Sequence, residues 1–121
     1  MPQAAVFFDR DDTLIEDPGY LRDPDGVRLA PGAVDAVARL RRAGYRIIVV
    51  TNQSGIARGL LDEPTLQAIH ERMKQLFAEA AAPIDAIYYC PYLDGPEAVV
   101  ERYRRDSDLR KPRSGMYALA A

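Results

Sequence analysis

The stretch Val6-Phe7-Phe8-Asp9-Arg10-Asp11-Asp12-Thr13-Leu14 decides the fold of this chain. Its apolar residues run into a cluster of carboxylates, and a hydroxyl follows. A short apolar run bounded by polar residues predicts a buried strand. If the chain stays extended past Phe8, successive side chains alternate, so Asp9 and Asp11 project to the same side. Because two neighbouring carboxylates repel each other unless a cation compensates, this pair suits a metal-assisted nucleophile and a proton donor.

Two further apolar runs follow the same pattern. Residues 46–51 are rich in β-branched side chains and predict a second buried strand. Residues 84–89 predict a third strand. Helical spacing of apolar residues predicts one helix over residues 33–43 and another over residues 62–82, with Asp62 as the N-cap of the second.

Strand and helix therefore alternate, which predicts an α/β fold with a parallel sheet and helices on both faces. Ligands of such sheets bind beyond the carboxyl ends of the strands. The acidic cluster that starts at Asp9 and the stretch Thr51-Asn52-Gln53-Ser54-Gly55 each follow a predicted strand. Two polar clusters on one rim of one sheet predict a functional site at that rim.

The connecting segments are polar and rich in turn residues. Residues 16–32 contain several prolines and glycines and predict a loop, long enough to be functional. Residues 90–112 are expected to be irregular, with a short helical turn near residues 97–103. Another helix is expected to begin at Ser114.

The composition limits the class of protein. A chain of 121 residues allows one domain, and a net charge of −2 argues against nucleic acid as the main partner. The sequence has no apolar run of membrane-spanning length and no signal peptide, so we expect no membrane association and a cytoplasmic location. Cys90 is the only cysteine, which excludes a disulfide within the chain.

Several residues that could carry chemistry have a plainer interpretation. His70 falls between the apolar stripe and the polar face of its predicted helix, and we interpret it as a surface residue rather than a ligand. Cys90 is interpreted as a small buried hydrophobic residue. The tyrosines at positions 88, 89 and 92 are expected to cover the sheet edge.

Three motifs together resemble the haloacid dehalogenase (HAD) superfamily, and within it the group of heptose 1,7-bisphosphate phosphatases and histidinol-phosphatases. The motifs are Phe8-Asp9-Arg10-Asp11-Asp12-Thr13, Thr51-Asn52-Gln53-Ser54-Gly55-Ile56-Ala57-Arg58-Gly59 and Arg110-Lys111-Pro112-x-x-Gly115-Met116. The resemblance covers nearly the whole chain. It implies a HAD-like core, which is a Rossmann-like three-layer sandwich with a parallel sheet.

The resemblance also implies a role for each matching residue. Asp9 would attack phosphorus and form an aspartyl phosphate, and Asp11 would protonate the leaving oxygen and then deprotonate water. The Asp9 carboxylate and the Asp11 carbonyl would bind Mg²⁺, while Thr51 and Lys111 would hold the phosphoryl oxygens. Lysine, hydroxyl, amide and Mg²⁺ groups give the alignment and charge stabilisation that phosphoryl transfer needs. The residues implied in recognition of the remaining substrate, a small phosphorylated metabolite, are Asp17, Gly19, Tyr20, Asn52, Gln53, Ser54 and Arg110.

The sequence departs from the family pattern at Asp12 and at the positions that bind zinc in some relatives. Asp12 replaces a usual glycine, and Asp tolerates unusual backbone angles better than most residues, so we expect a small effect. Zinc-bearing relatives carry a Cys-x-His pair and a later Cys-x-Cys pair. Here Cys90 is accompanied by Tyr92, Ser107 and Leu109, and because one ligand cannot hold a tetrahedral site, we expect no zinc.

The family pattern continues past Gly115-Met116 to a fourth strand, where an acidic motif completes the Mg²⁺ site. The sequence ends at Ala121, so residues 1–121 are expected to form a single phosphatase core that lacks its last strands. An ion without its third acidic ligand would be poorly held. We therefore expect the 121-residue chain to be a poor enzyme. We also expect residues 4–8 to form an apolar sheet edge through which two chains pair or aggregate.

Three functional hypotheses stay open on the sequence. The first is a Mg²⁺-dependent phosphatase of a small sugar phosphate, of the heptose bisphosphate type rather than histidinol phosphate. The second is a fragment or pseudoenzyme that binds phosphate without catalysis. The third is a receiver-type signalling domain, which also has a paired acid after its first strand, a hydroxyl and a Lys-Pro. That class needs an acceptor Asp at the end of its third strand, whereas Thr51-Asn52 occupies the matching slot here.

Overall fold

The computed structural model describes residues 4–107 and 109–111. Within them, strands and helices alternate as the sequence predicts. The elements in chain order are β1 (Ala5–Phe8), the short 3₁₀ helix η1 (Pro24–Gly26), α1 (Ala33–Arg42), β2 (Arg46–Asn52), α2 (Glu63–Glu79), β3 (Ala86–Cys90) and the 3₁₀ helix η2 (Glu101–Tyr103). The helix expected to begin at Ser114 lies outside the described residues.

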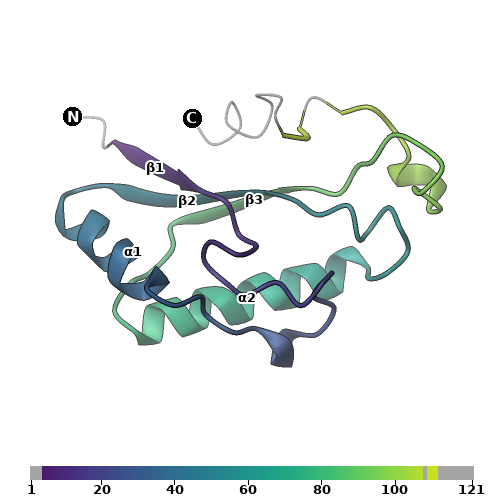
Figure 1. Cartoon of the computed structure of the whole chain (residues 1–121). Helices are drawn as coiled ribbons and strands as arrows, with labels where there is room; N and C mark the ends of the chain where they lie inside the picture. The colour runs from purple at the N-terminus through teal and green to yellow at the C-terminus, as the bar shows by residue number, and fades with distance from the viewer. Residues whose placement is uncertain (1–3, 108, 112–121) are drawn as a thin grey trace.

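The strands form one parallel sheet in the order β1-β2-β3, with β2 in the centre. Val6 of β1 is in register with Ile47 of β2, and Val49 of β2 is in register with Ile87 of β3. All three strands run in the same direction, so their carboxyl ends meet at one edge (Figure 1). This confirms the predicted parallel sheet.

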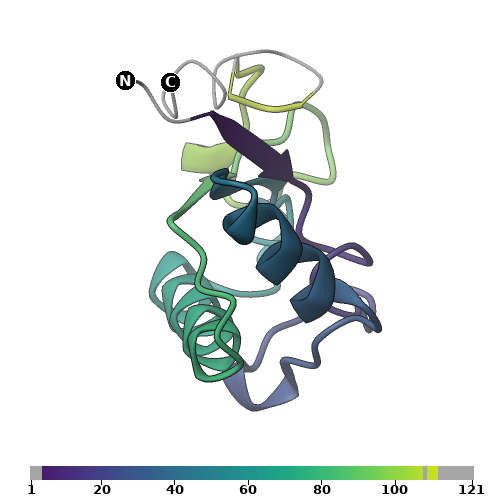
Figure 2. The ribbon, with the colours of Figure 1, turned by 90° about the vertical axis from the view of Figure 1, so that its left-hand side faces the viewer.

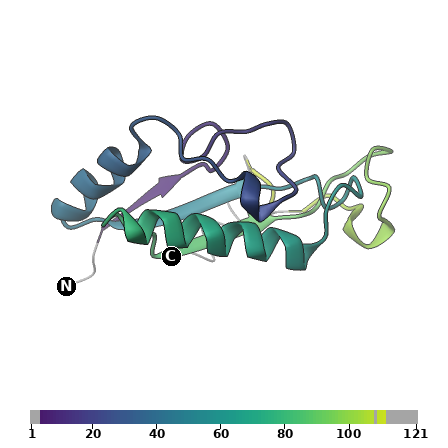
Figure 3. The same ribbon diagram turned by 90° about the horizontal axis from the view of Figure 1, so that it is seen from below.

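Both helices lie on the same face of the sheet rather than on opposite faces (Figures 1 and 2). The expectation of helices on both faces is therefore not met within the described residues. The strand order explains the difference, because the chain steps from β1 to β2 to β3 in one direction. A right-handed crossover at each step places both helices on the same side. Figure 3 shows α2 running along β2 and β3 on that side.

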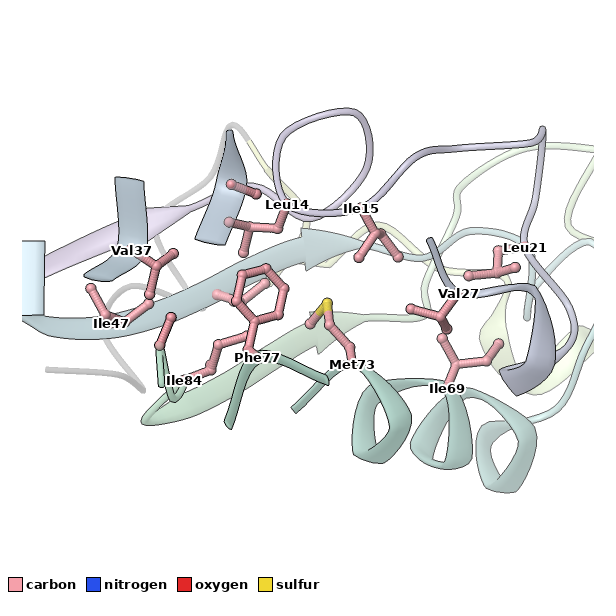
Figure 4. Packing of buried hydrophobic residues seen from close by; sticks show 13 residues of the cluster. Leu14, Ile15, Leu21, Val27, Val37, Ile47, Ile69, Met73, Phe77 and Ile84 are labelled. Atoms are coloured by element: carbon pink, nitrogen blue, oxygen red, sulfur yellow. The ribbon is translucent and has the colours of Figure 1, made fainter. Parts of the chain in front are cut away.

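The main core fills the space between this face and the two helices (Figure 4). Ile47 and Val49 point from β2 into the core, where they meet Val37 of α1 and Phe77 of α2, all of them fully buried. Side chains alternate along a strand, so the intervening Ile48 and Val50 face the other side, where they pack with Cys90. Both faces of β2 are thus apolar, as the uninterrupted β-branched run predicts.

Local hydrogen bonds fix both ends of α2. The Asp62 side chain accepts a hydrogen bond from the Thr65 amide at 2.8 Å, which confirms the predicted N-cap. After α2, Ala81 takes a left-handed conformation with φ 61°, and the Ala82 amide bonds back to the Phe77 carbonyl at 2.9 Å. This is a Schellman-type ending, and it stops the helix before residue 82.

The segment from residue 91 to residue 107 packs on the loop that follows β2. Ala98 and Tyr103 join Ile56, Ala57 and Leu66 in a second buried cluster. The Val100 amide donates to the Ala57 carbonyl at 3.0 Å. This packing leads the chain back toward the carboxyl end of the sheet. Within the described residues, neither α-helix is long and apolar enough to cross a bilayer.

Candidate functional site

The chain turns sharply as soon as β1 ends. The Arg10 carbonyl accepts hydrogen bonds from the Leu14 amide at 3.0 Å and the Ile15 amide at 3.2 Å. The extended backbone that would align Asp9 with Asp11 therefore stops at Arg10, and the two carboxylates have different partners. Asp12 has φ 58°, a left-handed angle that suits glycine and that Asp tolerates. Its Oδ1 accepts from the Asp17 amide at 3.0 Å, which holds the turn.

Asp9 lies at the rim of the sheet and pairs with Lys111. Its side chain is 52% exposed, and its Oδ1 lies 3.1 Å from Lys111 Nζ and 2.8 Å from the Arg10 amide. Lys111 Nζ also donates to the Val50 carbonyl of β2 at 3.0 Å. The ammonium group therefore stands between the ends of β1 and β2, beside the predicted nucleophile.

Asn52, the last residue of β2, holds Lys111 in this place. The Asn52 Nδ2 donates to the Lys111 carbonyl at 3.3 Å, and the Lys111 amide donates to Asn52 Oδ1 at 2.8 Å. The Asn52 side-chain amide thus bonds to the Lys111 backbone N–H and C=O in the way that the backbone of a neighbouring strand would. Asn52 was predicted to recognise substrate, and in the structure its amide is also bonded to the backbone that carries the lysine.

Gln53 links the predicted proton donor to the predicted phosphoryl ligand of β2. Its Nε2 donates to Asp11 Oδ2 at 3.2 Å and to Thr51 Oγ1 at 2.9 Å. Thr51 is buried, and its hydroxyl accepts this bond from Gln53 and donates to the Asn52 carbonyl at 3.4 Å. The side chains after β1 and after β2 are in this way connected into one hydrogen-bonded group.

A cavity of about 290 Å³ opens beside this group. Gly55 forms part of its wall, and a Cβ at that position would lie 2.8 Å from a Leu61 methyl and 3.3 Å from the Tyr20 ring, so a larger residue would have to displace the end of the Leu61 side chain. The Arg58 guanidinium lies 5.6 Å from the centre of the same ring, at the outer side of Tyr20. The lining residues are Arg10, Asp11, Asp17, Gly19, Tyr20, Asn52, Gln53, Ser54 and Gly55.

The structure thus brings together most of the residues singled out from the sequence. Six of the residues predicted to recognise substrate line the cavity, whereas Arg110 does not. Arg110 Nη1 instead donates to the Tyr92 carbonyl at 3.3 Å. Asp9, Thr51 and Lys111 lie at the strand ends outside the cavity lining. Pro112, Gly115 and Met116 of the third motif lie outside the described residues.

His70 was interpreted as a surface residue, and this is wrong. Its side chain is 5% exposed, and its Nε2 lies 3.2 Å from Nη1 of the buried Arg10. Burial, followed by the nearby Arg10 charge, lowers the pKa of His70 to about 3. Sequence reasoning assigned no role to Arg10 or Arg58. The only available signal was the position of Arg10 between two acids, because its burial depends on α2 packing over it.

The four positions compared with zinc-bearing relatives lie together in the structure. Cys90 is fully buried, as predicted, and Tyr92 and Leu109 pack against its cluster. Ser107 Oγ accepts from the Leu109 amide at 3.1 Å. Burial raises the pKa of the Cys90 thiol, which keeps it protonated and unreactive at neutral pH.

The residues at the rim suit a hard cation. No group of three or more His, Cys, Asp or Glu side chains gathers as a metal cluster in the described part of the chain. The Asp9 carboxylate is half exposed and offers oxygen, the donor atom that Mg²⁺ prefers, and Mg²⁺ commonly takes one or two carboxylates together with substrate oxygens and water. The donor set therefore fits Mg²⁺, with Asp9 and the Asp11 carbonyl as the predicted ligands.

Comparison with known proteins gives the family. The family model described as polynucleotide kinase 3 phosphatase matches residues 4–121. The chain belongs to this family. It is 42% identical over 112 residues to the D-glycero-beta-D-manno-heptose-1,7-bisphosphate 7-phosphatase of Photorhabdus laumondii, and 41% identical over 112 residues to that of Escherichia coli K12. Each alignment covers 93% of this chain and 58% of the relative, so the chain spans about three fifths of their length.

Solved structures show the same fold as this member of the polynucleotide kinase 3 phosphatase family. A HAD-like phosphatase structure from Mesorhizobium loti matches with a TM-score of 0.85 and 37% identity, over 98% of this chain and 56% of that one. The D,D-heptose 1,7-bisphosphate phosphatase of B. bronchiseptica matches with a TM-score of 0.79 and 37% identity, over 98% of this chain and 62% of that one. The second structure is complexed with magnesium and phosphate, so magnesium occurs in a close structural relative. The HAD-like fold predicted from the motifs is confirmed.

Proposed function

We propose that this chain carries the catalytic core of a Mg²⁺-dependent phosphatase that acts on a small sugar phosphate of the heptose bisphosphate type. The observation that carries the proposal is the contact between Lys111 Nζ and Asp9 Oδ1, 3.1 Å apart at the ends of two neighbouring strands. A carboxylate paired with an ammonium group at an exposed rim can meet a phosphoryl group with both a nucleophile and a charge partner. The curated relatives with this name support the substrate class.

The proposed reaction has two steps, and Asp9 and Asp11 take part in both. An Asp9 carboxylate oxygen attacks phosphorus, and the bond from phosphorus to the ester oxygen breaks while Asp11 gives that oxygen a proton. Water then attacks the aspartyl phosphate, Asp11 takes its proton, and phosphate leaves with the Asp9 carboxylate restored. Splitting the displacement into two steps lowers the barrier of each. The Asp9 carboxylate and the Asp11 carbonyl would hold Mg²⁺, whose charge would stabilise the phosphoryl oxygens.

The remaining site residues stabilise charge and select the substrate. Lys111 and the Thr51 hydroxyl hold phosphoryl oxygens, and Gln53 orients both that hydroxyl and Asp11. The cavity beside Asp11 is about 290 Å³ in volume, a size that suits a small metabolite. Its wall of amide, hydroxyl, carboxylate and tyrosine groups can hydrogen-bond the hydroxyls of a sugar. The expected location remains the cytoplasm, where such metabolites occur.

Release of inorganic phosphate from heptose 1,7-bisphosphate, with and without Mg²⁺, tests this proposal. We expect slow Mg²⁺-dependent turnover, which Asp9→Asn lowers by about 10³-fold or more because the nucleophile is lost. Asp35→Asn is the matched control, since Asp35 is an exposed acid of α1 that pairs only locally with Arg39. Turnover should be faster than with histidinol phosphate or a 3′-phosphorylated oligonucleotide.

Two results would contradict the proposal. Retained turnover in purified Asp9→Asn would exclude Asp9 as the nucleophile. Phosphate binding by the native chain without turnover of any sugar phosphate would instead favour the non-catalytic, phosphate-binding alternative.

A further inference from the structure

Arg10 is a buried cation that connects the site to helix α2. Its side chain is 1% exposed. A buried guanidinium is stable only when its donors are paired. Here Nε and Nη2 lie 2.8 and 2.7 Å from Asp11 Oδ1, and Nη1 lies 3.2 Å from His70 Nε2. Three nitrogens of the guanidinium are therefore directed at two side chains that lie far apart in the sequence.

His70 is suited to accept the hydrogen bond from Arg10 Nη1. The guanidinium only donates, so the Nε2 of His70 must accept, which places its proton on Nδ1 and leaves the ring neutral. The ring also contacts Tyr89 of β3, with the two ring centres 5.9 Å apart. Its position is therefore set by α2 and β3 together, and it presents a fixed acceptor to Arg10.

The two oxygens of the Asp11 carboxylate have different hydrogen-bond partners. Arg10 occupies Oδ1 with two donors, whereas Oδ2 accepts from Gln53 Nε2 at the longer distance of 3.2 Å. Asp11 lines the cavity together with Gln53. Asp11 Oδ1 accepts two charge-assisted hydrogen bonds from the Arg10 guanidinium. Oδ2 is therefore the oxygen left to hold a proton toward the cavity.

We propose that Arg10 and His70 are positioning residues that lock the Asp11 side chain, so that Oδ2 is the oxygen that exchanges the proton with the leaving group and with water. The inference rests on the proposed phosphatase function. A general acid must lie within hydrogen-bond reach of the proton it transfers, and small misplacements are costly. His70 acts through Arg10 and touches neither substrate nor the reacting atoms.

Two substitutions of the same histidine separate positioning from packing. His70→Gln keeps an acceptor near the place of Nε2, whereas His70→Leu keeps the bulk and removes the acceptor. General acid catalysis is worth about 10²–10⁴-fold, so partial loss of its alignment should lower kcat in His70→Leu by about 10-fold with KM unchanged. His70→Gln should stay within about 3-fold of the native kcat. Lys74→Ala is the control, because Lys74 lies one turn further along α2 and borders the same small outer pocket as His70.

A second measurement does not depend on turnover. The Arg10 Nε proton can be followed by ¹⁵N NMR, and we expect slow exchange with water in the native chain, in His70→Gln and in Lys74→Ala. It should exchange faster in His70→Leu, because the guanidinium loses one of its two anchors. A native chain without phosphatase activity would refute the proposed function, and this NMR comparison would still test the positioning.

The inference would be overturned by equal kcat values for His70→Leu and His70→Gln, or by kcat values that follow only the melting temperature across the variants. It would also be overturned by an Arg10 Nε proton that exchanges equally slowly in His70→Leu.

Discussion

His70 is the only histidine of the chain, and it lies in an environment that keeps it neutral. Burial removes water from the ring, and the Arg10 guanidinium repels a second positive charge, so its pKa falls from 6.5 to about 3. The unfolded chain exposes this ring and binds a proton below pH 6.5, whereas the folded chain does not until about pH 3. The native state therefore loses stability relative to the unfolded state as the pH falls through this window.

The free energy of unfolding should accordingly decrease on acidification. For this single group we expect a loss of about 2 kcal/mol between pH 7 and pH 5, because the unfolded state binds more protons over that range. Urea unfolding at the two pH values measures the loss. His70→Gln removes the only imidazole, so the part of the pH dependence that disappears in this variant belongs to His70. An equal loss in the native chain and in His70→Gln would contradict the prediction.

Some residues of the site could be predicted from the sequence, and others could not. Asp9, Thr51 and Asn52 could be found because each directly follows an apolar run whose end defines a rim. Arg10 and His70 could not be paired, since each lies on its own element and only the packing of α2 beneath the sheet brings them together. Lys111 could be singled out only through the motif Arg110-Lys111-Pro112 that carries the family resemblance. Its contact with Asp9 depends on Asn52 holding its backbone.

Glu63 connects three elements at the start of α2. Its Oε1 accepts from the Tyr89 hydroxyl of β3 and its Oε2 from the Tyr103 hydroxyl of η2, each at 2.9 Å. Burial raises the pKa of both tyrosines, and the Glu63 carboxylate raises each of them further. This acid fastens the segment from residue 91 to residue 107 to the framework of the sheet.

Removing this carboxylate should loosen that attachment. We expect Glu63→Ala to lower the free energy of unfolding by about 2 kcal/mol, because it removes hydrogen bonds to a charged acceptor. In Glu63→Gln, spectrophotometric titration should show two tyrosines ionising at lower pH than in the native chain. The double variant Tyr89→Phe/Tyr103→Phe is the control, and adding Glu63→Ala to it should cost little more. A full additional loss there would show that Glu63 acts through other contacts.

The elements themselves were largely predictable. Short apolar runs predicted β1, β2 and β3, and the Asp62 cap predicted the start of α2. The placement of both helices on one face was not predictable from alternation alone, because it depends on the order in which the strands pair. The segment from residue 91 to residue 107 carries little periodicity, so only its short helical turn was anticipated.

For the molecule as a whole, β1 forms one edge of the sheet among the described residues. Among the residues that the structure describes, β1 pairs only with β2. It carries Val6, Phe7 and Phe8, and Phe7 is 38% exposed. An apolar edge strand favours pairing with another chain. On the outer face of the sheet, Ile48 and Val50 of β2 are buried, and Tyr92 and Leu109 pack against their cluster.

The 121-residue chain should therefore associate in a concentration-dependent way. Phe7→Lys introduces a charge on the edge strand and should shift the chain toward the monomer in light scattering at several concentrations. Val99→Lys is the control, since Val99 is the most exposed large apolar residue but lies far from β1 in the segment after β3. A native chain that stays monomeric at high concentration would contradict the expectation.

The reciprocal contact between Asn52 and Lys111 also bears on the order of folding. The two residues are 59 positions apart, and Arg10 and His70 are 60 positions apart. Contacts of such separation must overcome the entropy of closing a long loop before they contribute any stability. During synthesis β1, α1 and β2 leave the ribosome well before Lys111 does. The proposed nucleophile Asp9 is thus made early but receives its ammonium partner late, so we expect no turnover by the nascent chain before Lys111 joins the rim.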